Sequence, residues 1–402
     1  MKILVVSNFY PPHTIGGYEL GCRDVVEGLR QRGHDLQVLT STHGLLHPER
    51  IDQVERVLAV DLGWDWAKTG TGWRLFQKEL ANRRAMRRAL VTFKPDLVYI
   101  WSLRYCSVAL AMQAQRAPVP TCFYVSDTWL AEWQGRDRWF QTPHDSWRRR
   151  LKQALNGAVE WVGGRTNGEL RLQHLQCTSD YIRRVTAPAG EARVIHWGID
   201  PAKVVARAPR VNGPLRLLYA GQLIAHKGVH TALRACELLC ADGVDVTLTL
   251  AGATADVNYL RELTALAAPL GERVRFTGGL PRAELATLYA AHDVLLFPSI
   301  WPEPFSIGLL EGMAAGLGVV ATATGGTAEI LRDQHNALLF TPDNEAECAT
   351  AITRLHHEPD LLAKLGNAAR ATVLESFRLD QMLDQVEQHV QQVYYESRQQ
   401  PD

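Results

Sequence analysis

The chain has 402 residues and a mass of 44.9 kDa, which at roughly 100 to 200 residues per domain predicts two domains. Hydrophobic residues make up 46% and charged residues 21%, a composition that excludes disordered and fibrous chains. Lys and Arg total 43, as do Asp and Glu, and this zero net charge argues against a nucleic-acid partner. The sign differs along the chain, because residues 1–187 carry 26 basic and 18 acidic residues whereas residues 188–402 carry 17 and 25.

Cysteine usage and hydropathy indicate the compartment. The seven cysteines form no C-x-x-C pair, so neither a disulfide framework nor a zinc ribbon is predicted, and a reducing cytoplasm fits best. No segment approaches eighteen apolar residues, and the apolar run 3–6 is too short for a signal peptide. We therefore expect a cytoplasmic protein that neither spans a membrane nor uses the usual export route.

Short β-branched runs alternate with helical patterns from the first residues onward. We expect strands at 2–7, 35–40, 54–60, 96–101, 119–125 and 174–178, and helices at 17–31, 73–93, 106–116 and 145–161. Such alternation is typical of a mostly parallel sheet covered on both faces.

A polar stretch rich in Pro and Ala, residues 200–214, interrupts this pattern and is the best linker candidate. A second α/β unit follows, with strands expected at 215–220, 246–251, 274–276, 294–298 and 319–322 and helices at 229–241, 256–270, 283–291, 307–315 and 344–356. The tail is predicted to form helices at 361–375 and 379–398. Two doubly wound domains facing each other would hold a small-molecule site in the cleft between them.

The first chemically suggestive segment is Gly221-Gln-Leu-Ile-Ala-His-Lys-Gly228, which joins a predicted strand to a predicted helix. Lys227 lies at the helix N-terminus, where free N–H groups and the helix dipole favour an anion and the ammonium adds a point charge suited to phosphate. An ordinary strand-to-helix turn with a solvated lysine would carry the same glycines.

The second segment, Glu303-Pro-Phe-Ser-Ile-Gly-Leu-Leu-Glu311, places two carboxylates eight positions apart. Glu303 is expected in the loop before a helix and Glu311 inside the helix, about 7 Å further along the axis. One acid can then reach the head of an elongated ligand and the other its middle, while the first-turn amides face any anion between them. The alternative is a surface turn followed by a glutamate on an exposed helix face.

Together with Gly325-Gly326, these segments resemble the family 4 retaining glycosyltransferases of GT-B architecture, which have two doubly wound Rossmann-like domains facing across a cleft. The resemblance extends to the opening M-K-I-L-V-V-S-N-F-Y-P-P, to Gly16-Gly17-Tyr18-Glu19 and to Trp197-Gly198-Ile199-Asp200. It implies an N-terminal acceptor-binding domain over 1–199 completed by the helix 379–402, a linker at 200–214, and a nucleotide-sugar-binding domain over 215–378.

The resemblance also implies roles for single residues. Lys227 would bind the diphosphate of the donor, Glu303 the hydroxyls of its sugar and Glu311 those of its ribose. Phe305, Ser306 and Ile307 would present backbone amides to the diphosphate or sugar. Gly16 and Gly17 would let the first loop approach the same group without a Cβ clash.

Two positions depart from the family pattern. Gln222 stands where many members have Arg, so stabilisation of the leaving group would rest more on Lys227 and the helix dipole. Where many members have a sugar-contacting His, the chain reads Ser126-Asp127-Thr128-Trp129. Asp127 is therefore a candidate catalytic residue, although an Asp after a strand is also a common helix cap.

Two clusters point to the acceptor. Nine of the eleven tryptophans lie between Trp64 and Trp161, and their rings could stack on a sugar or pack in the core. Arg83, Arg84, Arg87 and Arg88 share one predicted helix, which could contact anionic lipid or an anionic acceptor, or be a solvated face. Peripheral contact with the inner face of the membrane is therefore an open alternative.

The sequence thus predicts an enzyme that transfers a sugar from a UDP- or GDP-sugar donor to a hydroxyl of a glycan, lipid-linked or small-molecule acceptor, with retention. No D-x-D triplet occurs, so neither a metal nor another cofactor is expected to be required. A nucleotide-sugar epimerase of the same fold and a nucleotide-sugar-binding protein without turnover are the alternatives. The nucleotide base, the sugar, the acceptor and the oligomeric state stay open.

Overall fold

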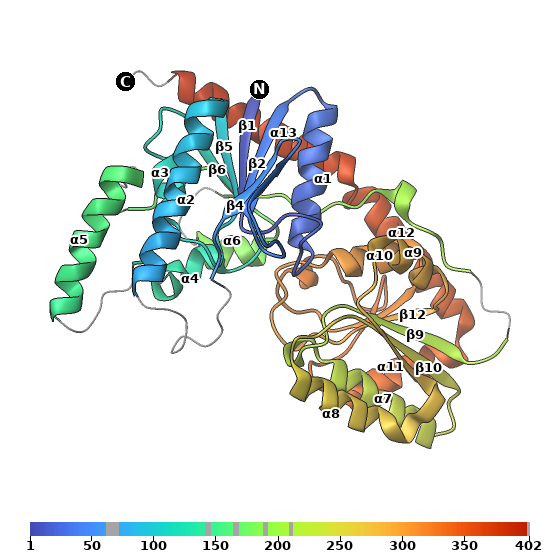
Figure 1. Cartoon of the computed structure of the whole chain (residues 1–402). Coiled ribbons are helices and arrows are strands. Elements are labelled where there is room, and N and C mark those ends of the chain that lie inside the picture. The colour runs from blue at the N-terminus through green and yellow to red at the C-terminus, as the bar shows by residue number, and fades with distance from the viewer. Residues whose placement is uncertain are drawn as a thin grey trace. The chain divides into compact units, whose positions relative to one another are not determined.

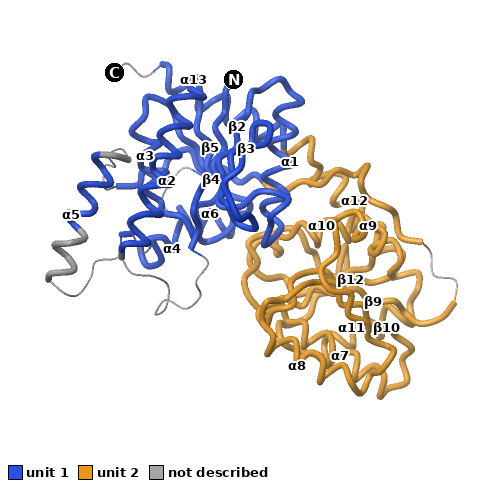
Figure 2. Tube along the Cα trace, viewed as in Figure 1, with its two compact units in different colours: residues 1–195, 383–402 blue, residues 196–382 orange. Residues whose placement is uncertain are grey.

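The computed structural model divides the chain into two compact units, which Figure 2 colours separately. Unit 1 contains residues 1–195 and 383–402, and unit 2 contains residues 196–382. The structure describes residues 1–61, 72–137, 139–140, 146–163, 169–187, 192–208 and 212–399.

In the described part of unit 1, eight strands form one sheet in the order β3-β4-β2-β1-β5-β6-β7-β8. Every neighbouring pair is parallel except β3 and β4. The strands are β1 (Lys2–Ser7), β2 (Asp35–Ser41), β3 (Glu49–Ile51), β4 (Val54–Leu58), β5 (Leu97–Ser102), β6 (Thr121–Val125), β7 (Leu175–Cys177) and β8 (Ala192–Val194). The central strands β1, β5 and β6 are buried at every position except Lys2 and are mostly apolar, because helices cover both faces of the sheet.

The helices of unit 1 are α1 (Tyr18–Gln31), α2 (Gly72–Phe93), α3 (Ala109–Ala114), α4 (Trp129–Arg136), α5 (Ser146–Gly163), α6 (Asp180–Thr186) and most of α13 (Leu379–Gln399). Helices α2 and α3 pack against one face of the sheet and share a core cluster with it (Figure 1). Helix α1 packs against α13 at Gly28, where any Cβ would lie 2.5 Å from Leu383. The C-terminal helix is thereby part of unit 1 from Leu383 onward.

Unit 2 is a second parallel sheet. Its described strands lie in the order β11-β10-β9-β12-β13-β14 and comprise β9 (Leu215–Ala220), β10 (Val246–Ala251), β11 (Val274–Gly278), β12 (Val294–Phe297), β13 (Gly318–Ala321) and β14 (Leu338–Leu339). Because β9 pairs with both β10 and β12, the winding direction reverses beside β9, which is where open α/β sheets bind ligands.

Six α-helices in the described part of unit 2 cover this sheet: α7 (Val229–Ala241), α8 (Val257–Ala267), α9 (Arg282–Ala290), α10 (Ile307–Ala315), α11 (Glu345–His357) and α12 (Pro359–Ser376). Figure 1 shows α7, α8 and α11 on one face of the sheet and α9, α10 and α12 on the other. Four short 3₁₀ turns are described as well: η1 (Pro201–Lys203), η2 (Ala225–Lys227), η3 (Ala268–Arg273) and η4 (Gly325–Glu329).

The stretch expected to be a linker, residues 200–214, packs on unit 2 where it is described. The Arg207 N–H donates to the Ala315 carbonyl at 2.7 Å, and the Ala208 N–H donates to the Ala290 carbonyl at 3.0 Å. The Arg207 guanidinium also pairs with buried Asp293 at 3.1 Å. Its irregular sequence therefore reflects a chain that runs along the helices of unit 2.

Among the described residues, none of the helices combines the length and the apolar content that a membrane crossing requires.

Candidate functional site

The carboxyl end of β9 and the loop after β12 meet at two glycines in unit 2. Gly228 has a φ of +66°, and a Cβ on it would lie 1.9 Å from the Pro298 carbonyl oxygen. Gly325 has a φ of +57°, and its Cβ would lie 2.4 Å from the Glu303 carbonyl oxygen. Gly228 therefore lets η2 approach the loop after β12, and Gly325 lets the loop after β13 approach the same loop at Glu303, because a side chain at either position would push the two segments apart.

This approach pairs the two charged residues that the sequence singled out. Lys227 is the last residue of η2, and its Nζ donates to Oε1 and Oε2 of Glu303 at 2.6 and 2.7 Å. Glu303 is 1% exposed and also accepts a hydrogen bond from the Ser299 hydroxyl. The Lys227 side chain keeps 24% of its surface exposed. The cation can thus reach a ligand while its counter-ion is held in the protein.

Helix α10 begins directly after this pair. Ser306 is its N-cap and accepts a hydrogen bond from the Leu309 N–H at 3.2 Å. Its hydroxyl therefore serves the helix, whereas Ile307 occupies the first helical position, where an N–H has no acceptor within the helix. Phe305 stacks on His196, with ring centroids 5.2 Å apart. The predicted amide segment Phe305 to Ile307 is thus fixed at both ends.

Glu311 lies one turn inside α10, as its spacing predicts. Its Oε1 accepts a hydrogen bond from Nε of Arg282 at 2.8 Å, a contact that sequence reasoning missed because Arg282 begins a different helix, α9. Tyr289 of α9 donates to the Gly308 carbonyl at 3.2 Å, and burial, followed by the nearby Glu311 carboxylate, raises the pKa of this tyrosine. Helix α9 therefore orients the start of α10.

Gln222 and His226 of the Gly221–Gly228 loop lie at the surface, whereas Leu223 is buried. Gln222 is exposed, and its backbone carbonyl accepts a hydrogen bond from the Tyr219 hydroxyl at 2.7 Å. His226 lies beside Trp301, with ring centroids 5.0 Å apart. Burial, followed by the neighbouring Lys227 charge, lowers the pKa of His226, so this ring is neutral at pH 7. Neither His226 nor Trp301 was predicted to belong to the site.

The other predicted site residues belong to unit 1. Gly16 precedes α1, and its N–H donates to the Glu19 carboxylate at 3.0 and 3.2 Å. The Ile15 N–H donates to the same carboxylate at 3.0 Å, and Gly17 is the N-cap of α1. Glu19 is fully buried, which raises the pKa of its carboxyl group. Glu19 belongs to the Gly16-Gly17-Tyr18-Glu19 segment that the sequence shares with the family, but no role was predicted for it.

Asp127 follows β6 at the carboxyl edge of the unit 1 sheet, as expected. It accepts hydrogen bonds from the Arg104 guanidinium at 3.1 and 3.2 Å and from the Trp129 N–H at 2.7 Å. The N-cap position of α4 is Thr128, whose side chain makes no capping hydrogen bond, so Asp127 holds the first helical N–H from the residue before the cap. Its side chain keeps 24% of its surface exposed, which leaves room for a ligand contact in addition.

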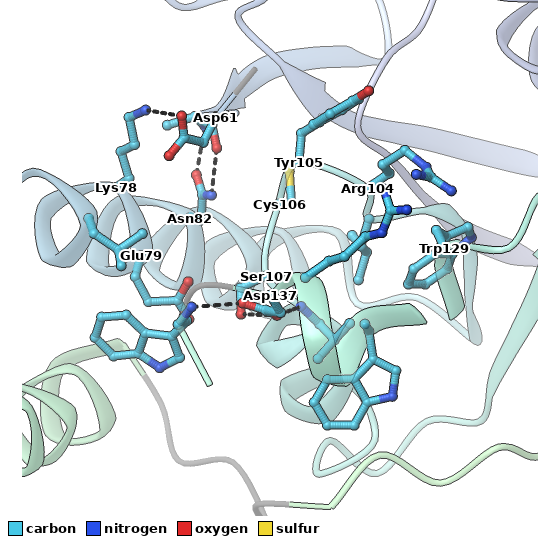
Figure 3. A pocket seen from close by; sticks show the side chains of 17 residues that line it. Asp61, Lys78, Glu79, Asn82, Arg104, Tyr105, Cys106, Ser107, Trp129 and Asp137 are labelled. Atoms are coloured by element: carbon cyan, nitrogen blue, oxygen red, sulfur yellow. Dashed lines mark hydrogen bonds and ion pairs between the residues drawn. The ribbon is translucent and has the colours of Figure 1, made fainter. Parts of the chain in front are cut away.

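Beside Asp127, unit 1 contains a pocket of about 180 Å³. Figure 3 shows its lining, which comes from α2, the loops after β4 and β5, α4 and the residues that follow α4. Asn82 fixes α2 to the loop after β4, because its side chain exchanges two hydrogen bonds with the backbone of Ala59 at 2.7 and 2.9 Å. Asp137 fixes the loop after β5, because it accepts from the Val108 N–H at 2.8 Å and the Ser107 hydroxyl at 3.1 Å.

The predicted arginine face of α2 needs one correction. Arg83 is 1% exposed and donates to Glu79 at 2.6 Å, because positions four apart share a helix face and this face packs inward. Arg84, Arg87 and Arg88 are exposed.

The tryptophans differ in burial. Trp101 is buried against Tyr124, with ring centroids 4.3 Å apart, whereas Trp161 is 85% exposed. Trp64 and Trp66 lie outside the described residues.

Comparison with known proteins identifies the family. Residues 15–203 match the family model "Glycosyltransferase Family 4" and residues 204–372 match "Glycosyl transferases group 1". The chain is 28% identical over 396 residues to a glycogen synthase of Mycobacterium tuberculosis, covering 94% of this chain and 91% of that protein. It is 24% identical over 396 residues to an uncharacterized glycosyltransferase of Methanocaldococcus jannaschii, covering 94% and 95%.

Solved structures agree on the fold. A sucrose-phosphate synthase from Thermosynechococcus elongatus superposes with a TM-score of 0.75 at 21% identity, covering 98% of this chain and 99% of that one. HepE from Anabaena, solved in complex with UDP-glucose, superposes with a TM-score of 0.70 at 21% identity, covering 98% and 100%. The two family models meet end to end along the sequence, and both units have the doubly wound topology, so the chain belongs to the family 4, group 1 glycosyltransferases and has the GT-B fold.

Proposed function

We propose that this glycosyltransferase moves a sugar from a nucleoside diphosphate sugar to a hydroxyl of an acceptor, with retention of the anomeric configuration. The observation that carries the proposal is the Lys227–Glu303 pair beside the N-terminus of α10. It combines a partly exposed cation, a buried carboxylate and helix N–H groups within one loop cluster.

Each part of this cluster suits one part of the donor. The diphosphate is an anion, and the Lys227 ammonium together with the first amides of α10 favours it electrostatically. The charge on the diphosphate grows as the glycosidic bond breaks, so these contacts strengthen in the transition state and accelerate the reaction. Glu303 accepts hydrogen bonds from the sugar hydroxyls, because an ionised carboxylate is an acceptor only.

Glu311 is assigned to the ribose hydroxyls. It lies one turn beyond the amides in α10, and Arg282 holds one of its oxygens at 2.8 Å. A carboxylate that an arginine orients in this way has a fixed direction, which lowers the conformational entropy that ligand binding must remove. Gln222 contributes hydrogen bonding at the leaving group without a second positive charge.

We further propose that the departing diphosphate accepts the proton of the attacking hydroxyl on the same face of the sugar. The protein then contributes position and charge stabilisation, and neither a covalent intermediate nor a metal ion is required. In unit 1, Asp127 is assigned to orient the acceptor hydroxyl or the donor sugar, since it lies at the carboxyl edge of the sheet next to the pocket.

The relatives support this proposal by what their names record. Structures of Anabaena HepE contain UDP, UDP with glucose, and UDP-glucose. A glycogen synthase and a putative colanic acid glycosyltransferase of Salmonella typhimurium are among the similar curated proteins. A hexosyl donor carried by UDP or GDP and a glycan acceptor, free or lipid-linked, are therefore the first substrates to test.

The decisive experiment follows donor turnover. The protein is incubated with UDP- and GDP-hexoses, with and without glycan acceptors, and nucleoside diphosphate release and product anomers are followed by NMR. Transfer with retention and at most slow hydrolysis without acceptor is expected, and EDTA should leave the rate unchanged. Conversion of the donor sugar without acceptor would establish an epimerase instead, and an inverted product would refute the retaining mechanism.

A further inference from the structure

We propose that the pocket in unit 1 binds the terminal ring of an uncharged saccharide, so that this enzyme glycosylates a neutral glycan and not a phosphorylated or carboxylated sugar. The inference rests on the proposed function, because it names the acceptor of that reaction. It is carried by the aromatic lining of the pocket, by its charge pairing and by its size.

Three indoles line the pocket. Trp129 and Trp139 are 4% and 5% exposed, and Trp133 is half-buried and meets Phe140 edge to face at 5.5 Å. Sites for organic ligands are lined mainly by apolar and aromatic side chains with a few polar groups that fix orientation. The faces of indole rings suit the C–H faces of a pyranose, which are apolar although the ring edge is hydroxylated.

The pocket also contains an unused buried donor. The Trp129 Nε1–H has less than 1 Å² of exposed surface and no hydrogen-bond acceptor among the described residues. An unsatisfied buried N–H costs about 1–3 kcal/mol, so such a group in a lining residue favours a ligand that carries acceptors. A hydroxyl provides both an acceptor and a donor without adding charge.

The cations of the lining have carboxylate partners. They are paired as Lys78 with Asp61 at 4.0 Å, Arg104 with Asp127 at 3.1 Å and Arg136 with Glu132 at 2.7 Å. The charge of each cation is therefore already offset, and a phosphate or carboxylate on the ligand would also lie close to one of these carboxylates. Within the described lining, a negatively charged ligand therefore gains little over an uncharged one.

The two other acidic groups of the lining are engaged as well. Asp137 accepts from the Val108 and Trp139 N–H groups and from the Ser107 hydroxyl. Glu79, which is 3% exposed, accepts from Arg83. Burial, against the opposing effect of Arg83, raises the pKa of Glu79 to about 7, so this carboxyl group is partly neutral at physiological pH. The described lining thus offers an incoming cation no unpaired carboxylate.

The volume sets the size of the ligand. About 180 Å³ equals roughly six water molecules at their share of liquid volume. This accommodates one pyranose ring and is below the range of about 300–1,000 Å³ that is typical for larger ligands. The pocket therefore binds a single terminal sugar, and the rest of a longer glycan extends outside it.

The test uses saturation-transfer NMR on the full chain with methyl α-glycosides of glucose, mannose and galactose, each compared with the corresponding hexose 6-phosphate. At least one neutral glycoside is expected to bind with a millimolar dissociation constant, and its phosphorylated counterpart at least tenfold more weakly. Binding of the phosphates alone, or binding of none of the glycosides, would overturn the assignment.

Variants locate the binding. Trp133→Ala should lower the affinity for the glycoside at least tenfold. Trp161→Ala changes an exposed tryptophan outside the pocket and should leave this affinity unchanged. If Trp133→Ala does not fold, Leu75→Trp fills the same half-buried lining and should abolish binding. An unchanged affinity in a folded Trp133→Ala or Leu75→Trp variant would place the sugar elsewhere.

The same variants separate this inference from the proposed function. Slow donor hydrolysis without acceptor uses the donor residues proposed above, none of which lines the pocket, so the ratio of hydrolysis to transfer should rise in Trp133→Ala. If no nucleotide sugar is turned over by any variant but the glycoside still binds in a Trp133-dependent way, the proposed reaction fails and the pocket assignment stands.

Discussion

Breaking the Lys227–Glu303 pair should reduce both stability and activity, by separable amounts. Lys227→Met keeps the length of the side chain and removes its charge. Among the described residues, the buried Glu303 carboxylate, 1% exposed, then keeps the Ser299 hydroxyl as its side-chain donor. Removing one partner of a buried ion pair costs about 3–5 kcal/mol. Because a quarter of the lysine side chain is exposed, we expect the lower end, about 3 kcal/mol, or roughly 6–12 °C in Tm for a unit of this size.

The double variant Lys227→Met/Glu303→Gln removes the orphaned charge. The amide keeps hydrogen bonding to Ser299, so most of the lost free energy of unfolding should return. Activity should not return, because both groups contact the donor in the proposed mechanism and a lost transition-state contact of this kind costs roughly 10²–10³ in kcat. Urea unfolding and steady-state donor release measure the two effects on the same samples.

Two results would refute this reasoning. A double variant as unstable as Lys227→Met would show that the charge on Glu303 is not what the lysine compensates. Turnover close to wild type in a folded Lys227→Met variant would remove the lysine from the donor site. The matched control is Lys203→Met, because Lys203 is a surface lysine of unit 2 with 67% of its side chain exposed, and it should change neither quantity measurably.

Two further predictions concern unit 1. Asp127→Asn should keep the hydrogen bond from the Trp129 N–H and part of the activity. Asp127→Ala should lose about 1 kcal/mol of stability and be at least tenfold less active than Asp127→Asn. Wild-type activity with a lowered Tm in Asp127→Ala would mean that Asp127 only stabilises the start of α4. Burial lowers the pKa of His389 to about 4, below its unfolded value, so stability is present above about pH 6.5 and falls toward pH 4, by roughly 2 kcal/mol at pH 4.5. Urea unfolding of His389→Leu should lack this pH dependence.

The central elements could be predicted from the sequence because their apolar pattern is continuous. The strand 215–220 and the helix 229–241 have the boundaries that periodicity indicates, since a strand buried on both faces forms a nearly continuous apolar run, which only Arg216 interrupts here. Short edge elements carry no such pattern. Strand β3 has three partly or fully exposed residues and β14 has two residues in all, so both were missed.

The candidate site divides in the same way. Glu303 and Glu311 belong to one segment whose cap residue, Ser306, fixes the start of α10, so their spacing could be predicted. The contact of Glu303 with Lys227, 76 positions away, depends on the pairing of β9 with β12 and could not. The unit 1 pocket draws its lining from residues between Ala59 and Trp139 with no fixed spacing, and only the fold brings them together. The error at Arg83 was avoidable, because Glu79, Arg83, Met86 and Leu90 recur at helical spacing on the face that packs inward.

The loop before α1 separates a steric role of glycine from a hydrogen-bonding one. The Gly16 N–H already donates to buried Glu19, so its remaining contribution to donor binding is the absence of a side chain. A Cβ on Gly16 would lie 3.6 Å from Glu19 Oε2, an ordinary contact, so Gly16→Ala should change the free energy of unfolding by less than about 0.5 kcal/mol.

If the donor approaches this loop as the family resemblance implies, the same methyl group should raise the KM for the nucleotide sugar at least tenfold, because it would occupy space that the diphosphate or sugar needs. The control is Gly157→Ala on α5, where a Cβ meets nothing within 4 Å, and it should leave KM unchanged. An unchanged KM in Gly16→Ala would mean that the donor does not approach the loop at this residue. A raised KM together with a loss of stability would instead trace the effect to a displaced Glu19, which Glu19→Gln, with its donor-capable amide, should reproduce.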